Sequence, residues 1–434
     1  MNASVAIVSL YSLLLTSIYF FIGYLALLTG STDSISLYTM VAGFVILLPV
    51  IFGGIVYGIN MFDGIFISTF KPDNVFVIIA ILYFIYSAAR QGDLTSGVVF
   101  FRNSAGFFLI FVFAVHMSRY MHIGGWNKSL YLLFAFAFFF AVMDLLLGYD
   151  FWRLYFPSNF IGEIKHAGVD ENGVMGNKYN TFMGVRLYRI SGAFFEPHHL
   201  GHFFAILSAF FFVNKKWFVF FASLLILLAT FVKSSYLFFV LIVVYYNYLS
   251  RLRRRLDMNL ILYSIVMVFI LVKWLSLLFP HSTIGAHLQS SLLVFDLIDR
   301  PSDFLFGNSY GSTYDAGGNS LENFSVLASD SGLSSVILSS GFIGAIMFLI
   351  LFKVILKLVD RARLQFKNSS VIFYESLVCS WFSMLPFASS HLSPVVSFFV
   401  FFPAGLIVLS SVRVIAPEQL RDSSKVLALR FLRM

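Results

Sequence analysis

One short segment brings together the residue types that accept protons and the residue types that bind anions. Histidine and glutamate are frequent proton acceptors in general base catalysis, and arginine holds phosphate oxygens with a planar fork of donors. The segment lies directly before an apolar run and reads Arg186-Leu-Tyr-Arg189-Ile-Ser-Gly-Ala-Phe-Phe-Glu196-Pro-His198-His199-Leu-Gly201-His202. Its mixture of acid, base and fixed cations indicates a functional site. The alternative is an ordinary interfacial collar whose acid caps a helix.

The local order of these residues predicts how a helix would present them. Pro197 suits the first helical position, where its missing N–H leaves no hydrogen bond unmade. Glu196 would then sit at the N-cap, where the helix dipole favours its charge. His198 and His202 are four residues apart and share one helix face, while His199 points about 100° away.

A second candidate is Arg102, which lies about two turns inside an apolar run. A charge in a membrane span is costly and usually faces a cavity or a partner. Arg102 either extends its side chain to the membrane–water interface or binds a lipid pyrophosphate with its guanidinium. Asp144, near the end of its own run, either pairs with Arg102 or faces water.

A second polar stretch offers Arg300, Tyr310 and Asp330 as candidates, although most of its acids are expected to be solvated loop. Asp330 could equally cap a helix that starts at Leu333. His281 and His287 are expected to be surface histidines at an interface, and His391, between the last two predicted spans, is expected to be similar.

Several motifs are missing from the sequence. It has no Gly-rich phosphate loop with Lys and Ser/Thr, which argues against ATP hydrolysis. No Asp-x-Asp pair occurs in an external loop, which argues against a metal-dependent glycosyltransferase. His198 and His202 alone make half a metal site, so neither a metal nor a cofactor is predicted. Cys379 is the one cysteine, which excludes an intrachain disulfide.

The elements that would position these residues are set by composition. Of 434 residues, 59% are hydrophobic and only 12% charged, with a mean hydropathy of +0.88. Soluble domains carry about 25% charged residues, so the chain is predicted to be an all-α polytopic membrane protein. Apolar runs long enough for about twelve spans occur near 5–29, 36–59, 74–90, 96–117, 129–149, 198–214, 216–232, 235–250, 259–279, 333–358, 370–387 and 393–412.

Two polar stretches divide the predicted spans. Spans one to five are predicted within 1–149, spans six to nine within 197–279, and spans ten to twelve with a cytoplasmic tail within 333–434. The first large loop is predicted at 150–196 and the second at 280–332. Placing both termini inside puts most Lys and Arg on the cytoplasmic side, with Arg251-Leu-Arg-Arg-Arg255 as the strongest anchor. Both loops then face away from the cytoplasm. The net charge of +8 therefore reflects membrane topology and not nucleic-acid binding.

In this layout and in its local motifs the chain resembles the Wzy-type O-antigen polymerases, which share a superfamily with the O-antigen ligases. The resemblance rests on Arg189 to Gly201, the spacing of Arg300 and Gly311, Leu305-Phe-Gly307, Asp330-Ser-Gly332 and Gly341-Phe-Ile-Gly344. Two features depart from the family pattern. Eleven residues, not ten, separate Arg189 from Gly201, and Asp330 stands where the ligase branch is known for a histidine.

The resemblance implies a metal-independent glycosyltransferase of GT-C-like architecture in the bacterial inner membrane, with its active site facing the periplasm. Such an enzyme moves a growing glycan from undecaprenyl pyrophosphate to a new lipid-linked repeat unit. Its partners would be these lipid-linked units, the bilayer and a chain-length regulator.

Within this resemblance, the predicted catalytic residues are Arg189, Glu196, His199 and Arg300. The predicted substrate-binding residues are Arg102, Arg186, His198, His202, Tyr310 and Asp330. Glu196 is the preferred general base, with His199 or His198 as competitor. Two other functions are retained as alternatives. One is an O-antigen ligase that joins glycan to lipid A–core, and the other is a non-enzymatic flippase, which should have short external loops and more charges deep in its spans.

Overall fold

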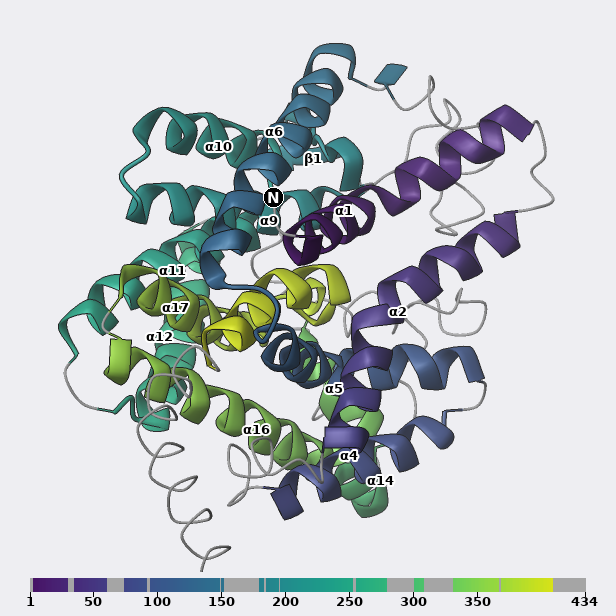
Figure 1. Ribbon diagram of the computed structural model, residues 1–434, viewed down its shortest axis with the longest axis vertical. Helices are drawn as coiled ribbons and strands as arrows, with labels where there is room; N and C mark the ends of the chain where they lie inside the picture. The colour runs from purple at the N-terminus through teal and green to yellow at the C-terminus, as the bar shows by residue number, and fades with distance from the viewer. Residues whose placement is uncertain are drawn as a thin grey trace, which may run out of the picture.

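The computed structural model is built almost entirely of helices (Figure 1). It describes residues 3–29, 35–60, 74–91, 94–148, 150–151, 179–182, 185–194, 196–252, 255–278, 300–307, 331–366 and 368–408. The helices before the first predicted loop are α1 (Ala3–Thr29), α2 (Ile35–Asn60), α4 (Asn74–Ala89), α5 (Leu94–Met117) and α6 (Ile123–Leu147).

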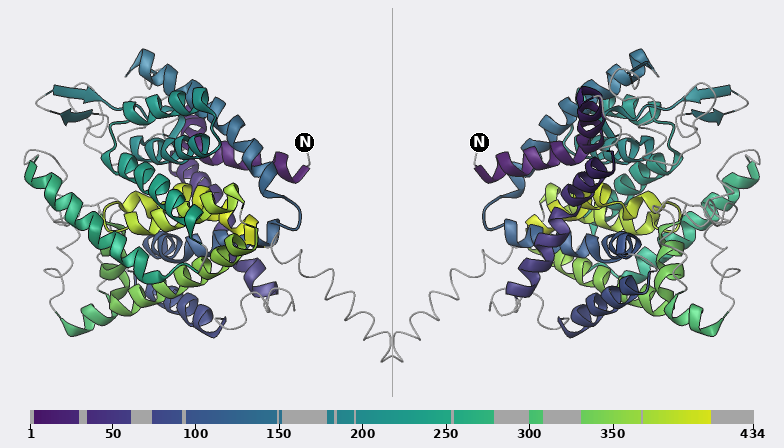
Figure 2. Two further views of the ribbon diagram at one scale, coloured as in Figure 1. Left: turned by 90° about the vertical axis from the view of Figure 1, so that its left-hand side faces the viewer. Right: turned by 90° about the vertical axis from the view of Figure 1, so that its right-hand side faces the viewer.

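A hairpin and four helices form the middle of the chain. They are β1 (Tyr179–Phe182), β2 (Val185–Tyr188), the 3₁₀ turn η2 (Gly192–Phe194), α9 (Pro197–Val213), α10 (Trp217–Ala229), α11 (Lys233–Arg251) and α12 (Met258–Leu278). The two strands are antiparallel, with Tyr179 opposite Tyr188. Figure 2 shows this hairpin projecting from the helical body.

The last part of the described chain includes the helix at the centre of the molecule. It comprises α14 (Pro301–Phe306), α16 (Gly332–Phe366), α17 (Ser369–Met384), the 3₁₀ turn η4 (Ser389–Leu392) and a final helix, Pro394–Val408. This final helix, yellow in Figure 1, lies among the others, and every one of its residues is buried. Its Phe398, Phe399 and Phe402 pack around Trp126 of α6.

Each of the twelve apolar runs predicted from the sequence contains a helix. Within the described residues, three helical segments are both long and apolar enough to cross a membrane: Gly97–Met117, Ile123–Leu147 and Gly332–Phe366. Seven shorter apolar helices accompany them. The fold is therefore all-α with membrane-spanning character, while the number of twelve spans stays a prediction.

The outer surface of the helices is rich in large apolar side chains. Phe218 is 87% exposed, and Leu10 and Leu225 are also largely exposed. Soluble monomers rarely expose continuous apolar surface on this scale. Helices that are apolar outside as well as inside are typical of a protein surrounded by lipid.

Two helix ends differ most from the predicted runs, and each difference has a structural reason. α6 begins at Ile123 and not near 129, because Trp126 in its first turns is fully buried in the aromatic core. α16 continues to Phe366 and not to 358, because Asp360 and Arg363 are buried and paired with each other. The predicted run ends before these charged residues because it follows hydropathy, whereas the helix continues through them.

Candidate functional site

The predicted site segment runs from the end of β2 through η2 into α9. Arg189, the first residue after β2, is 9% exposed. Its Nε donates to the carbonyl oxygen of Thr230 over 3.2 Å, and its Nη2 lies 3.3 Å from His198 Nε2. Burial lowers the pKa of Arg189 to about 10, against the opposing effect of Tyr236. The guanidinium therefore still carries its positive charge at neutral pH.

Asp144 of α6 anchors this segment from the other side. It is fully buried, and it accepts a hydrogen bond from the hydroxyl of Tyr188 at 2.6 Å. It also accepts from the backbone N–H groups of Ser191 at 2.7 Å and Gly192 at 2.9 Å. Of the two sequence-based alternatives, exposure to water is wrong, because the side chain is fully buried, while a pair with Arg102 stays a prediction. Asp144 fixes the turn that carries Arg189.

Gly201 marks the other end of the predicted arginine-to-glycine segment. A Cβ at this position would lie 2.6 Å from Ser235 Oγ and 3.1 Å from Thr230 Oγ1. The absence of a side chain lets α9 approach the start of α11 closely. Arg189 and Gly201 thus both lie against Thr230 at the end of α10, Arg189 through the Thr230 carbonyl and Gly201 through the Thr230 side chain, and Gly201 also lies against Ser235 of α11.

The start of α9 has the predicted geometry. Pro197 occupies its first turn and Glu196 is the N-cap residue, although the Glu196 side chain makes no capping hydrogen bond. Glu196 Oε2 lies 3.7 Å from His199 Nδ1, and both side chains are partly exposed, at 28% and 15%. An exposed carboxylate–imidazole pair of this kind can accept a proton from a hydroxyl group.

His202 lies one turn further along α9 and is fully buried. Its Nδ1 is 2.5 Å from the His198 carbonyl oxygen and 3.2 Å from Ser235 Oγ. Because a carbonyl oxygen only accepts, Nδ1 carries the proton and Nε2 is left as an acceptor in the neutral ring. No residue in the described part of the chain hydrogen-bonds this Nε2.

His391 of η4 completes the cluster, and the sequence-based interpretation of it was wrong. It was expected to be a surface histidine, but its side chain is fully buried. Its ring packs edge-to-face against His202, with centroids 4.3 Å apart. Burial, together with His202 and His198 nearby, lowers the pKa of His391 well below its usual value. No local pattern indicates this contact, because almost 190 residues separate the two histidines.

The other predicted cations lie on different elements. Arg102 is half-buried on α5, and its Nε donates to Asn103 Oδ1 over 3.1 Å. Arg300 is exposed and caps the N-terminus of α14 through its backbone. α5 and α14 both pack against α16. The backbone of Arg186 pairs with Thr181 in the hairpin, while Tyr310 and Asp330 lie outside the described residues.

Two motifs of the predicted second loop and the helix after it do come together. α16 is broken at Gly341, which has φ of 69°, and a Cβ there would lie 2.3 Å from the Leu305 carbonyl. Gly307 makes the reciprocal approach to the Ser339–Ser340 backbone. Short α14 therefore sits backbone-to-backbone in the break of α16.

Arg90 is a contact residue of this region that the sequence did not reveal. It follows α4, and its guanidinium donates to the carbonyl oxygens of Phe306 and Gly307 over 3.1 and 3.4 Å. Tyr83, also on α4, donates to the Ser340 carbonyl over 2.6 Å. α4 thus holds both sides of the α14–α16 junction.

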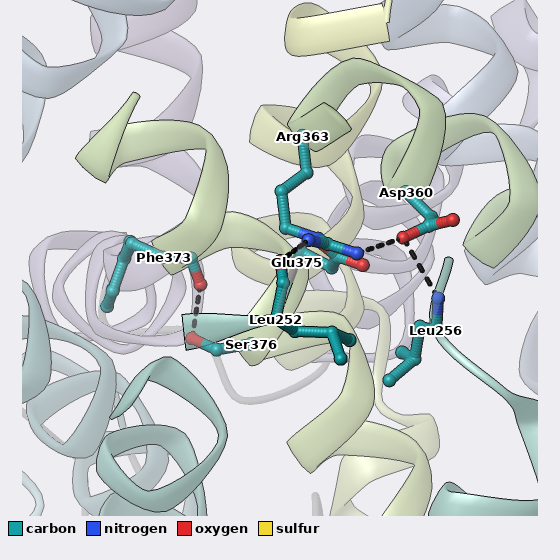
Figure 3. Close-up of polar contacts among 7 residues, drawn as sticks. All are labelled: Leu252, Leu256, Asp360, Arg363, Phe373, Glu375 and Ser376. Carbon is teal, nitrogen blue, oxygen red and sulfur yellow. Dashed lines mark hydrogen bonds and ion pairs between the residues drawn. The ribbon is translucent and has the colours of Figure 1, made fainter. Parts of the chain in front are cut away.

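A second buried charged cluster, named here the α16–α17 ionic cluster, consists of Asp360, Arg363 and Glu375 (Figure 3). Arg363 Nη2 lies 2.5 Å from Asp360 Oδ1, and Arg363 Nε lies 2.6 Å from Glu375 Oε2. Arg363 Nη1 donates to the Leu252 carbonyl over 2.7 Å. The cluster therefore joins two helices to the connection between α11 and α12, and it shares no residue with the Arg189 segment.

No group of three or more His, Cys, Asp and Glu side chains within the described ranges is arranged to hold a metal ion. Comparison with known proteins adds no assignment: no family model and no curated protein matches this chain.

Proposed function

We propose that this protein is a Wzy-type O-antigen polymerase of the bacterial inner membrane, with its active site on the periplasmic side. The observation that carries the proposal is the arrangement at the start of α9. There, a buried charged arginine and the partly exposed Glu196–His199 pair flank a turn that Asp144 holds in place. Fixed cations and a proton acceptor are what transfer from a lipid pyrophosphate requires.

In the proposed reaction, the bond between the anomeric carbon of the growing glycan and its pyrophosphate oxygen breaks. A hydroxyl oxygen of the incoming repeat unit forms the new bond to that carbon, and its proton passes to Glu196, with His199 or His198 as the alternative acceptor. The pyrophosphate leaves on undecaprenol with its negative charge stabilised by Arg189. Preorganised charges at a leaving group act strongly because they need no reorganisation during the reaction.

The remaining predicted residues have supporting roles in this proposal. Arg102, Arg186 and Arg300 supply further positive charge for the lipid-linked substrates, and His202, Tyr310 and Asp330 bind the saccharide or its carrier. A chain-length regulator is the expected protein partner. The pyrophosphate bond supplies the driving force, so the proposed reaction requires no nucleotide cofactor.

The test uses the source bacterium with its chromosomal copy deleted and variants supplied on a plasmid. Deletion of a polymerase leaves lipopolysaccharide with single repeat units, whereas deletion of a ligase leaves none and accumulates carrier-linked chains. Arg189→Ala and Glu196→Ala should each reduce long-chain material at least tenfold at unchanged protein level, since loss of one charge-stabilising donor commonly costs about 10²–10³ in rate.

Arg255→Ala is the matched control, because Arg255 is exposed in the connection between α11 and α12. It should leave the ladder of chain lengths unchanged. Long-chain material at the wild-type level in both Arg189→Ala and Glu196→Ala would remove these residues from the mechanism. A deletion strain that still makes long chains would reject the polymerase itself.

A further inference from the structure

The turn η4 lies where three elements that carry candidate residues meet. It contacts α5, which bears Arg102, and it contacts α16, against which α14 packs. Its His391 packs on His202 of α9. These elements are far apart in the sequence, so η4 is a junction that only the folded chain creates.

The backbone of His391 is held firmly in this junction. Its carbonyl oxygen accepts from Trp381 Nε1 at 2.7 Å and from Ser397 Oγ at 3.2 Å. Its ring lies edge-to-face against both His202 and Phe238, with centroids 4.3 and 4.7 Å apart. Close packing against two neighbouring rings restricts the position of this fully buried ring.

From His391, a continuous set of contacts leads to Arg189. His202 touches His391 with its ring and bonds Ser235 and the His198 backbone with Nδ1. The His198 side chain contacts the Arg189 guanidinium. A change in the position of the His202 ring would therefore reach Arg189 through one intermediate residue.

The segment from Leu385 to Leu392, which ends in η4, also holds the start of α16. The Leu333 N–H donates to the Leu385 carbonyl over 3.2 Å. A Cβ on Gly332 would meet Leu392 Cγ at 3.2 Å and the Ala388 carbonyl oxygen at 3.3 Å. The helix that follows the predicted second loop is thus seated on the residues that flank His391.

We propose that His391 is a positioning residue of the candidate site: by packing on His202, it fixes the first turns of α9, and with them Arg189, relative to α5 and the start of α16. This inference rests on the proposed polymerase function. His391 itself is buried away from solvent and contacts neither Arg189 nor the Glu196–His199 pair in the described contacts, so it acts through His202.

The experiment measures the rate at which pulse-labelled lipopolysaccharide gains more than one repeat unit, in the deletion strain carrying wild-type or variant protein. His391→Ala removes the ring contact and should slow elongation about tenfold, since small displacements of catalytic groups cost up to about 10²-fold. His391→Phe keeps a ring of similar size and should retain at least about half of the wild-type rate. His116→Ala, at the far end of α5, is the matched histidine control.

A double variant separates positioning from general stability. If His391 acts through Arg189, then Arg189→Lys combined with His391→Ala should be no slower than Arg189→Lys alone, because coupled residues show non-additive effects. Additive losses, or a His391→Ala rate equal to wild type, would overturn the inference. Wild-type protein that makes only single repeat units would instead reject the proposed function, so the two failures are distinguishable.

Discussion

Asp144 and Arg189 show how much of this site depends on single buried charges. The Asp144 carboxylate accepts three hydrogen bonds from the segment that carries Arg189, and bonds to a charged group contribute about 1.5–3 kcal/mol each. Arg189 in turn donates a hydrogen bond from its Nε to the backbone carbonyl of Thr230. A guanidinium held in this way can meet an anion without first being ordered, which is the advantage of preorganisation.

At the residue scale, the burial of His391 also leads us to expect that the free energy of unfolding depends on pH. Burial and the neighbouring His202 and His198 lower its pKa in the folded protein, whereas the unfolded chain has the ordinary value of about 6.5. The unfolded state therefore binds more protons below that value, and this contribution to stability, complete above about pH 6.5, is lost as the pH falls. The thermal midpoint of the detergent-solubilised protein should fall between about pH 7 and 5.

The comparison variant is His391→Phe, which has no group to titrate at this position. Its free energy of unfolding should fall less steeply over the same pH interval, by up to about 1.4 kcal/mol per pH unit for one proton, and its thermal midpoint should accordingly fall less. The groups facing His391 are His202, His198 and, through His198, Arg189. Equal slopes for wild type and variant would show that His391 does not titrate in this range.

Local geometry was predictable from the sequence at this scale, and tertiary partners were not. The positions of Pro197 and Glu196 at the start of α9 follow from short-range rules about helix termini. The partner of Asp144 and the burial of His391 depend on which helices pack together. A single sequence does not contain that information in any local pattern.

At the scale of elements, the close approach of α9 and α11 depends on Gly201. Gly201→Ala would place a methyl group 2.6 Å from Ser235 Oγ, and overpacking of this kind costs about 1–3 kcal/mol. The thermal midpoint of the purified protein should therefore fall. Adding Ser235→Ala removes the nearest atom and should recover part of the loss.

Gly124→Ala provides the control for this substitution. Gly124 lies in α6, and no atom comes within 4 Å of a Cβ built there. An alanine in open space is expected to be neutral or to stabilise by about 0.4–1 kcal/mol through the unfolded chain. A Gly201→Ala protein as stable as Gly124→Ala would show that α9 and α11 can separate without cost.

The positions of the helices were largely predictable from apolar runs, including the division of residues 198–250 into three helices. The β1–β2 hairpin and the break in α16 were not predicted. The break at Gly341 exists because α14 packs into it, so its cause is a contact between segments that hydropathy treats independently. The same holds for Arg90, whose partners are backbone carbonyls of α14 and the glycine after it.

At the scale of the whole molecule, the α16–α17 ionic cluster ties distant segments together. Arg363→Met would leave Asp360 and Glu375 buried without their cation, and breaking a buried pair in this way costs about 3–5 kcal/mol. We expect a large fall in the thermal midpoint and in the amount of folded protein in the membrane.

Arg361→Met is the matched control, because Arg361 lies on the same helix and is exposed. It should change stability by less than about 0.5 kcal/mol, as surface substitutions usually do. Combining Arg363→Met with Glu375→Leu removes one uncompensated carboxylate and should reduce the loss. Equal midpoints for Arg361→Met and Arg363→Met would mean that the cluster contributes nothing to stability.

The burial of helix Pro394–Val408 among the others has a consequence for biogenesis. During synthesis, the preceding helices leave the ribosome before this one exists. The side chains that pack against it in the folded protein therefore lack these contacts at that stage. Until it arrives, Trp126 lacks the three phenylalanine rings that surround it. An intermediate without this helix would therefore be loosely closed, and folding would be complete only once this helix has packed among the others.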